Sequence, residues 1–519
     1  MSTPYEIQRL HYPDSTEIDP ARSLLEIKAQ RKGQPLRYFI RTFGCQQNES
    51  DSEKLAGMLE SLGFIQTDSY ETADFVLINT CSIRENADQR LFGHLGELKA
   101  LREKNKELKV AVCGCLPTQE QQREKILQSF AFVNLIFGPQ DLHRLPELVY
   151  EIYSGKKQLV EVNKANVVCE DIPSKRSRSF RALVSIMYGC NNFCTYCVVP
   201  ASRERERSRE FEDILAEVKK IANQGTPEVM LLGQNVNAWG FDLYPRPRRV
   251  KPADLNYNDH TLAELEAIRS GDYSSGINSF ARLVTAIAGV PGIKSVRYMS
   301  PHPRDFDGEM LAALKVSPEI ENHIHLPVQA GSDAVLKAMN RHYTRADYLR
   351  LVEALRHVRP GISITTDIMV GFPGETEQDF EDTLSLVEEV GFNSAFSFIY
   401  SARPHTPAAA MEQIDDGIKH ERFDRLLELL NRLSLADHQS LVGTKRNILL
   451  EGLSKQDSWV LTGRDSEFHL INVPLEPGKL SKEMQDGNGL PNANYFEGSF
   501  IKVEITEAKT FSLEAKSLD

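Results

Sequence analysis

Three cysteines lie within eight residues of one another, at Cys190, Cys194 and Cys197. A 4Fe-4S cluster is usually held by four thiolates, so a loop with this C-x3-C-x2-C spacing leaves one iron open to a substrate. A zinc knuckle is the alternative, but structural zinc normally takes four protein ligands. We therefore predict an iron–sulfur site with an open position, with these three cysteines as its metal ligands and catalytic residues.

A second set of cysteines is scattered along the chain, at Cys45, Cys81 and Cys115. Each follows an apolar run typical of a buried strand, and strands that alternate with helices indicate a parallel sheet. Because parallel strands end at one edge of a sheet, and ligands bind there, we expect the three thiols to meet as further metal ligands. Ordinary buried cysteines are the alternative. The expected strands are 37–43, 74–80, 109–112 and 132–137, with helices at 51–62 and 84–104.

Eight cysteines in a chain of 519 residues favour metal ligation over disulfides, because no positively charged apolar leader is present. Cys113 falls inside the third strand and Cys169 in a linker, so we expect both to be structural. The chain has no apolar run of 18 residues. A cytoplasmic protein with no membrane segment is expected.

The net charge of -12 argues against a general nucleic-acid binder, because neutralising phosphates requires surface Lys and Arg. Any contact with nucleic acid must then be local. Three basic segments are candidates, although a segment of this kind, taken singly, is more often a solvated face or a linker than a binding patch. They are residues 174–181, the series Arg203, Arg205, Arg207 and Arg209, and residues 246–251.

A second alternation of strands and helices begins near residue 182 and predicts six β/α units, which form a partial barrel. Glycine-rich and polar loops follow the expected strands, where barrel enzymes place their chemistry. The polar stretch 241–278 is long for a connection and is either a lid or a disordered insertion, the second being favoured. The expected strands are 182–188, 228–232, 294–299, 323–328, 363–370 and 395–400.

The two ends of the chain differ in pattern from its middle. Residues 1–36 lack periodicity and are expected to be a loosely ordered leader. From residue 443 short alternating segments predict a small antiparallel β module, which is either an RNA-binding barrel or a structural cap. The α/β multidomain chain then divides into a Rossmann-like domain at 37–153, the barrel at 176–440 and the β module at 441–510.

With these pieces placed, the chain resembles the methylthiotransferase family of radical S-adenosylmethionine (SAM) enzymes over about residues 37–510. The cysteine loop, Thr42–Asn48, Asn79–Glu85 and Gly233–Asn237 carry the resemblance. They are most similar to the branch that modifies tRNA. The branch that acts on a ribosomal protein is less similar at the first motif.

The resemblance implies two 4Fe-4S clusters, SAM and a carboxy-terminal TRAM module. In such enzymes SAM chelates the open iron and is cleaved to a 5′-deoxyadenosyl radical, while the auxiliary cluster holds sulfur. The implied substrate is tRNA with a prenylated adenosine next to the anticodon, whose C2 hydrogen is replaced by a methylthio group. Flavodoxin or ferredoxin is the implied electron donor.

The resemblance also implies roles for particular residues. Cys45, Cys81 and Cys115 become ligands of the auxiliary cluster, and the cysteine loop binds the radical cluster. Two groups of further residues are expected at the cofactor and at RNA. The SAM contacts are Tyr196, Gln234, Asn235, Ser300 and Gln329, and the RNA contacts are Arg203, Arg205, Arg207 and Arg464.

Some features depart from the family pattern. Residues 201–207 lose an aromatic residue and a glycine but keep the arginines, and the long stretch 476–497 puts the RNA-facing surface of the β module in doubt. Two other functions remain open: methylthiolation of a ribosomal protein, and a non-enzymatic iron–sulfur sensor that binds RNA. The sequence does not indicate the electron donor, the source of replacement sulfur or the oligomeric state.

Overall fold

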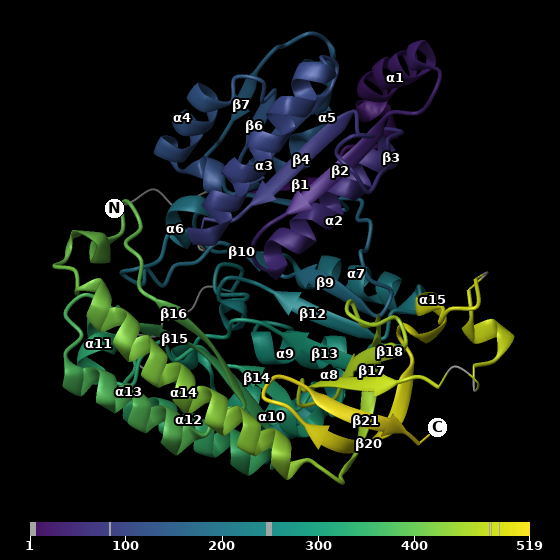
Figure 1. Ribbon diagram of the computed structural model, residues 1–519. Coiled ribbons are helices and arrows are strands. Elements are labelled where there is room, and N and C mark those ends of the chain that lie inside the picture. Colours follow the sequence, from purple (N-terminus) through teal and green to yellow (C-terminus); the bar gives the residue numbers. More distant parts are fainter. Residues whose placement is uncertain are drawn as a thin grey trace. The chain divides into compact units, whose positions relative to one another are not determined.

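The computed structural model describes residues 7–82, 85–244, 252–476, 478, 480–486 and 488–518 (Figure 1). The chain forms two compact units. The first comprises residues 1–177, 187–193 and 197–209, and the second comprises residues 178–186, 194–196 and 210–519. No helix in the described ranges is long and apolar enough to cross a bilayer.

The first unit is built on a six-stranded parallel sheet of order β3-β2-β4-β5-β6-β7. Both faces are buried: on β4, Leu77 belongs to one hydrophobic cluster, and Val76 and Ile78 belong to the other. Helices therefore cover both sides, as in a doubly wound α/β domain. The elements are β2 (Arg37–Thr42), α2 (Gln46–Ser61), β3 (Ile65–Gln66), β4 (Phe75–Thr80), α3 (Glu85–Lys104), β5 (Lys109–Gly114), α4 (Glu120–Ser129), β6 (Leu135–Phe137), α5 (Leu145–Tyr153) and β7 (Leu159–Glu161).

The segment expected to be a loose leader is instead part of this unit. Strand β1 (Gln8–His11) pairs in parallel with β8 (Val167–Glu170), and helix α1 (Ser15–Lys32) packs against α5. Ile18, Ala21 and Leu25 are buried in the core. The prediction of a loose leader is wrong for residues 8–32, because three well-spaced apolar residues suffice to anchor a helix. Residues 1–6 lie outside the described ranges.

The second unit begins with a partial barrel of six parallel strands, which confirms the predicted fold class. They form two three-stranded sheets of order β9-β12-β13 and β14-β15-β16. The predicted strand 182–188 ends sooner, because its last two residues form β10 (Met187–Tyr188), which pairs with β11 (Arg207–Ser208) in the first unit. The six strands are β9 (Arg181–Ser185), β12 (Glu228–Leu232), β13 (Ser295–Tyr298), β14 (His323–His325), β15 (Ser363–Val370) and β16 (Ser394–Ile399).

Helices on the outside of the barrel include part of the stretch that was expected to be disordered. Helix α8 (Asp259–Arg269) packs on α9 (Phe280–Ala288) and α10 (Gly308–Val316), with Leu265 and Ile268 fully buried. Residues 252–278 are therefore ordered, contrary to the expectation, while 245–251 lie outside the described ranges. The other helices are α7 (Phe211–Asn223), α11 (Asp333–Ala338), α12 (Arg345–Val358), α13 (Glu377–Val390) and α14 (Asp416–Ser440).

The end of the chain closes into a five-stranded barrel of order β17-β18-β19-β21-β20, consistent with a TRAM module. Four pairings are antiparallel, as expected, and β19 pairs with β21 in parallel. Strand β21 was not predicted, because only Leu513 and Ala515 of it are buried. The strands are β17 (Lys445–Leu453), β18 (Val460–Arg464), β19 (Leu470–Pro474), β20 (Phe500–Ala508) and β21 (Leu513–Ser517), with a short helix α15 (Ala493–Phe496).

Candidate cluster and cofactor sites

Cys45, Cys81 and Cys115 lie at the point in the first unit's sheet where the order of the strands reverses. Cys45 follows β2, Cys81 follows β4 and Cys115 follows β5. The chain passes from β2 to β3 on one side, while β4 and β5 continue on the other. Such a switch point opens a crevice at the carboxyl ends of the strands, where ligands of doubly wound sheets bind.

Two glycines allow the strand ends to approach closely at this crevice. Gly44 has a φ of +138°, and a Cβ there would lie 2.7 Å from the Cβ of Cys81. Gly114 has a φ of +96°, and its Cβ would lie 2.2 Å from the carbonyl oxygen of Thr80. A side chain at either position would separate the cysteines, since both the backbone conformation and the contact favour glycine.

The thiols meet in an environment that favours a thiolate at one of them. The pKa of Cys45 is lowered to about 6 by a hydrogen bond with Cys81 and, to a smaller extent, by the guanidinium of Arg203, against the opposing effect of burial. Cys45 also occupies the N-cap position of α2, although its side chain makes no capping hydrogen bond. Burial raises the pKa of Cys115, but the Nε of Arg203 lies only 3.1 Å from its Sγ. Positive charge and a helix N-terminus both suit an anionic sulfur site.

The residues around the crevice fit a cluster held by thiolates. Besides the three sulfur donors, the hydroxyls of Thr80 and Ser82 are buried and find no hydrogen-bond partner in the described part of the chain. Hydroxyls of this kind are suitable donors to cluster sulfides. Cys113, by contrast, belongs to the hydrophobic core, and burial raises its pKa well above the ordinary value. The geometry supports a structural role for Cys113.

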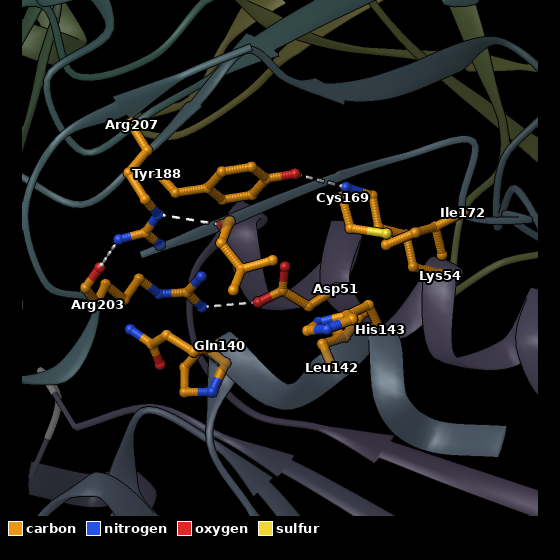
Figure 2. A pocket seen from close by; sticks show the side chains of 12 residues that line it. Asp51, Lys54, Gln140, Leu142, His143, Cys169, Ile172, Tyr188, Arg203 and Arg207 are labelled. Atoms are coloured by element: carbon orange, nitrogen blue, oxygen red, sulfur yellow. Dashed lines mark hydrogen bonds and ion pairs between the residues drawn. The ribbon is translucent and has the colours of Figure 1, made fainter. Parts of the chain in front are cut away.

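Arg203 is held inside the first unit. Its Nε faces Cys115, and its Nη2 lies 2.8 Å from a carboxylate oxygen of Asp51. Figure 2 shows this pair at the edge of a cavity of about 40 Å³, together with Arg207, whose Nε donates to the carbonyl of Val167. Arg203 and Arg207 are both buried, so the expectation that they contact RNA does not match their positions.

Two further residues that the sequence singled out, Arg205 and Cys169, lie in the first unit. Arg205 is exposed, with its guanidinium 4.5 Å from the centre of the Phe193 ring, and remains a proposed RNA contact. Cys169 lies on β8 beside the same cavity, and burial raises its pKa to about 12. An uncharged thiol in this place supports the expected structural role.

Replacing Arg203 by Met is expected to lower the free energy of unfolding of the first unit by about 3 kcal/mol, because the buried carboxylate of Asp51 loses its partner. Urea unfolding of the holoenzyme measures the effect. The double variant Arg203→Met with Asp51→Asn should recover much of the loss, since no buried charge remains unpaired. Arg205→Met is the matched control and should change the stability by less than about 0.5 kcal/mol. Equal effects of Arg203→Met and Arg205→Met would contradict this role.

The cysteines of the radical loop fall in both units, and each has its own neighbours. Cys190 accepts a backbone N–H from Asn192 at 3.5 Å, and Cys197 accepts one from Val199 at 3.5 Å. In the second unit the Nη1 of Arg341 lies 3.4 Å from the Sγ of Cys194. Arg341 is buried and was not predicted, because nothing in its sequence context distinguishes it. Hydrogen bonds to the sulfurs favour thiolates, which are the form that binds iron.

The residues expected at SAM lie after the barrel strands. Gln234 and Asn235 follow β12, and Asn235 is buried with its Oδ1 unpartnered in the described ranges. Ser300, after β13, and Gln329, after β14, adopt φ angles of +59° and +75°. Such backbone strain in residues other than glycine is concentrated at functional sites. Tyr196 lies in the cysteine loop, and all five residues remain proposed SAM contacts.

Arg464 lies between the terminal barrel and the partial barrel, within the second unit. Its guanidinium is 4.3 Å from the centre of the Phe468 ring and its Nε is 3.2 Å from a carboxylate oxygen of Glu451. The same ring stacks on His323 of β14 at 4.8 Å and lies under Arg297 of β13 at 4.7 Å. Arg464 therefore helps to hold the two barrels together, and because its side chain is 25% exposed its RNA contact remains a proposal.

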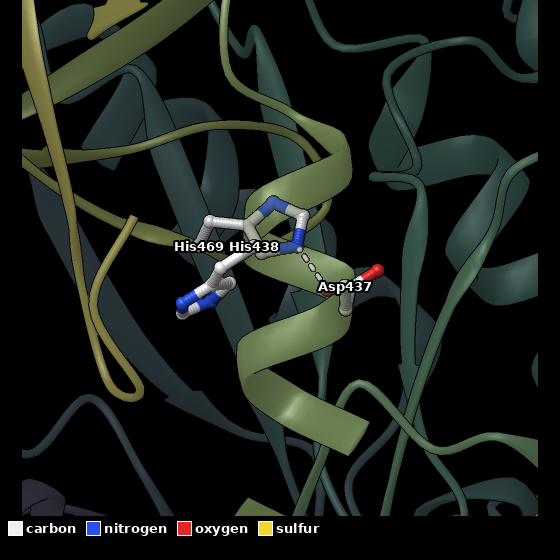
Figure 3. A group of neighbouring side chains, drawn as sticks. All are labelled: Asp437, His438 and His469. Carbon is white, nitrogen blue, oxygen red and sulfur yellow. Dashed lines mark hydrogen bonds and ion pairs between the residues drawn. The ribbon is translucent and has the colours of Figure 1, made fainter. Parts of the chain in front are cut away.

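A buried histidine, His469, links the terminal barrel to helix α14. The Nδ1 of His469 lies 2.9 Å from Asp465, and its Nε2 lies 3.3 Å from Asp437 of α14 (Figure 3). Burial alone would lower the pKa of His469, but the two carboxylates outweigh it and raise the pKa to about 9. The guanidinium of Arg446 on β17 lies 3.9 Å from the carboxylate of Asp465 and supplies a second positive charge beside the two carboxylates. His469 is thus an imidazolium that fastens the terminal barrel to α14.

The ion pairs of His469 with Asp465 and Asp437 should weaken as the pH rises. The folded-state pKa of about 9 lies above the ordinary value of 6.5, so the stabilisation is complete below pH 6.5 and is lost as the pH passes 9. We expect a loss of about 3 kcal/mol between these limits, measured by urea unfolding followed at the terminal barrel. His469→Gln should abolish this pH dependence. His438→Gln removes a bond to the carbonyl of Lys509 and an edge-to-face ring contact with His469, but leaves both carboxylate partners of His469 in place, and should keep the pH dependence. An unchanged pH dependence in His469→Gln would contradict the fastening.

Comparisons with known proteins agree with this geometry. The profile of the radical SAM superfamily matches residues 184–387, and that of an uncharacterised family, UPF0004, matches residues 37–138. A radical SAM methyltransferase, TsrM from Kitasatospora setae, shares 16% identity with a TM-score of 0.48, covering 72% of this chain and 77% of that one. The profile match and the cysteine loop place the chain among radical SAM proteins, a class that uses SAM and a 4Fe-4S cluster.

Relatives that match nearly the whole chain identify the family within this class. The tRNA-2-methylthio-N6-dimethylallyladenosine synthase of Lachnoclostridium phytofermentans is 42% identical over 485 residues, which cover 93% of this chain and 96% of that protein. The protein of the same name from Caldicellulosiruptor saccharolyticus is 44% identical over 480 residues, covering 92% of each. The chain belongs to the tRNA-2-methylthio-N6-dimethylallyladenosine synthase family, which confirms the resemblance to the branch that modifies tRNA.

Proposed function

We propose that this chain inserts a methylthio group at C2 of N6-dimethylallyladenosine next to the anticodon of tRNA. The observation that carries the proposal is the second set of thiols, Cys45, Cys81 and Cys115, which lies at the switch point of a separate domain. A radical enzyme that only abstracts a hydrogen has no use for such a set. A sulfur-transferring enzyme requires a place to hold the sulfur.

The chemistry of the substrate explains two cysteine sets. An adenine C2–H is neither acidic nor electrophilic, so its replacement requires a radical and a separate sulfur donor. When bound, the two clusters supply these: the radical cluster gives the electron that cleaves SAM, and the auxiliary cluster holds the sulfur. Two SAM molecules are used, one as methyl donor and one as radical source. The electron comes from a reduced flavodoxin or ferredoxin.

The chain's own residues bind and orient these groups. Cys190, Cys194 and Cys197 would hold a 4Fe-4S cluster through three of its irons, which would leave one iron open to SAM. Gln234 and Asn235 offer polar contacts at the barrel rim, where SAM binds in this proposal. Near the auxiliary thiols, the guanidinium of Arg203 lies 3.1 Å from the Sγ of Cys115 and would offset negative charge on a cluster bound there. We place the enzyme in the cytoplasm, with its tRNA.

A strain that lacks the gene for this chain tests the proposal. We expect its tRNA to lose 2-methylthio-N6-dimethylallyladenosine completely and to accumulate N6-dimethylallyladenosine, as measured by mass spectrometry of tRNA nucleosides. A plasmid copy should restore the methylthio nucleoside, and a copy with all six ligand cysteines replaced by Ala should not. Unchanged tRNA nucleosides, with a methylthio group lost from a ribosomal protein instead, would overturn the proposal in favour of the other branch.

A further inference from the structure

The inner face of the sheet β14-β15-β16 carries exposed aromatic side chains. Alternate residues of a strand point to opposite faces. On β16, Phe396 and Phe398 share one face and are 54% and 38% exposed. Their register partners on β15 are Asp367 and Met369, which are only partly buried.

The opposite face of this sheet is covered. Ile364, Ile368 and Val370 of β15 are fully buried, and helix α14 packs along β16. Phe396 and Phe398 therefore lie on the side away from the outer helices, which in a partial barrel is the inside. Single exposed apolar residues are normal, but two neighbouring rings beside a methionine form a patch, and patches of this kind mark binding sites.

Polar side chains lie next to the two phenylalanines. The ring of His325 meets that of Phe396 edge to face, with centroids 5.8 Å apart and planes at 73°. The Nε2 of His325 lies 3.5 Å from the Oδ1 of Asp367, and its Nδ1 lies 3.1 Å from the hydroxyl of Thr365. The patch thus combines two aromatic faces and a thioether with one partly exposed carboxylate. An apolar surface with a single acceptor suits a small, largely apolar ligand with one N–H donor.

We propose that this patch is the surface that recognises the prenylated adenine, and the inference rests on the proposed function. Aromatic side chains stack on unpaired bases of RNA. The dimethylallyl group adds five apolar carbons, which Phe398 and Met369 can remove from water. Prenylation leaves one hydrogen on N6, and the carboxylate of Asp367 is the acceptor available for it. Phe398 lies one residue before the end of β16, near the rim where the SAM contacts are proposed.

Binding without turnover tests this inference. The reconstituted holoenzyme, with SAM but no reductant, is titrated with two anticodon stem-loop RNAs that differ only in the N6-dimethylallyl group. Burial of part of this group predicts a preference of about tenfold or more for the prenylated RNA. Phe396→Ala with Phe398→Ala should bring the ratio of the two dissociation constants to within about twofold. Phe396→Leu with Phe398→Leu should keep part of the preference, because apolar contact remains.

The control is Phe511→Ala, which removes a 75% exposed ring from the terminal barrel and should leave the ratio unchanged. Iron content and thermal unfolding establish that each variant is folded and loaded. A wild-type enzyme without preference, or an alanine variant that weakens both RNAs equally, would overturn the inference. Failure of the proposed function has a different signature, because the reduced wild-type enzyme would then form no methylthio product even if it prefers the prenylated RNA.

Discussion

Replacing Cys45, Cys81 and Cys115 together by Ala is expected to eliminate the methylthio product while 5′-deoxyadenosine is still formed. These thiols follow β2, β4 and β5 in the doubly wound domain, whereas the loop proposed to bind the radical cluster comes after the first barrel strand. Removing the proposed sulfur-holding site leaves that loop intact. Both products are measured by mass spectrometry in one anaerobic reaction with the prenylated stem-loop RNA.

Cys113→Ala is the matched control for this variant. Cys113 lies two residues from Cys115, but its side chain belongs to the hydrophobic core of the sheet. We expect both products to be retained, with a loss of stability of about 1 kcal/mol from the small cavity. Continued methylthiolation by the triple variant would refute the division of labour between the two cysteine sets.

Replacing Cys190, Cys194 and Cys197 by Ala is expected to abolish 5′-deoxyadenosine formation entirely. By the ligand count, the loaded wild-type chain holds about eight irons, and this variant should hold about four. The remaining iron belongs to the auxiliary thiols, whose environment includes Arg203 and the N-terminus of α2. Iron analysis and 5′-deoxyadenosine assays measure the two effects.

Two outcomes would contradict this second expectation. An unchanged iron content would mean that the loop holds no cluster, and a loss of nearly all iron would mean that the auxiliary thiols cannot hold a cluster alone. Cys169→Ala is a suitable control, because this thiol lies on β8, outside both cysteine sets. It should change neither the iron content nor SAM cleavage.

The sequence was most informative where strands are buried on both faces. Strand β12 matches its predicted range of 228–232, because a parallel strand that is buried on both faces is a nearly continuous apolar run. Strand β15 also matches its range of 363–370, although only one of its faces is buried. The positions of Cys45, Cys81 and Cys115 at strand ends followed from the same pattern. The order β3-β2-β4, which makes that edge a crevice, required the structure, because strand order depends on long-range pairing.

The local sequence pattern does not predict which arginines of this series are buried. Arg203, Arg205, Arg207 and Arg209 alternate with other residues, and this spacing makes the four a candidate for local contact with nucleic acid. In the structure Arg205 is exposed, but Arg203 pairs with Asp51 and Arg209 with Glu170. The acidic partners are distant in sequence, so nothing near the arginines reveals which of them are buried. Arg341 beside Cys194 was missed for the same reason.

The most direct test of the account is a single reaction in vitro. The reconstituted enzyme is supplied with SAM, a reductant and an anticodon stem-loop RNA that carries N6-dimethylallyladenosine, and the digested RNA is analysed by mass spectrometry. We predict a nucleoside in which a methylthio group has replaced one hydrogen of the prenylated adenosine, formed together with 5′-deoxyadenosine. Formation of 5′-deoxyadenosine without this nucleoside, while a ribosomal protein supplied in parallel becomes methylthiolated, would contradict the account.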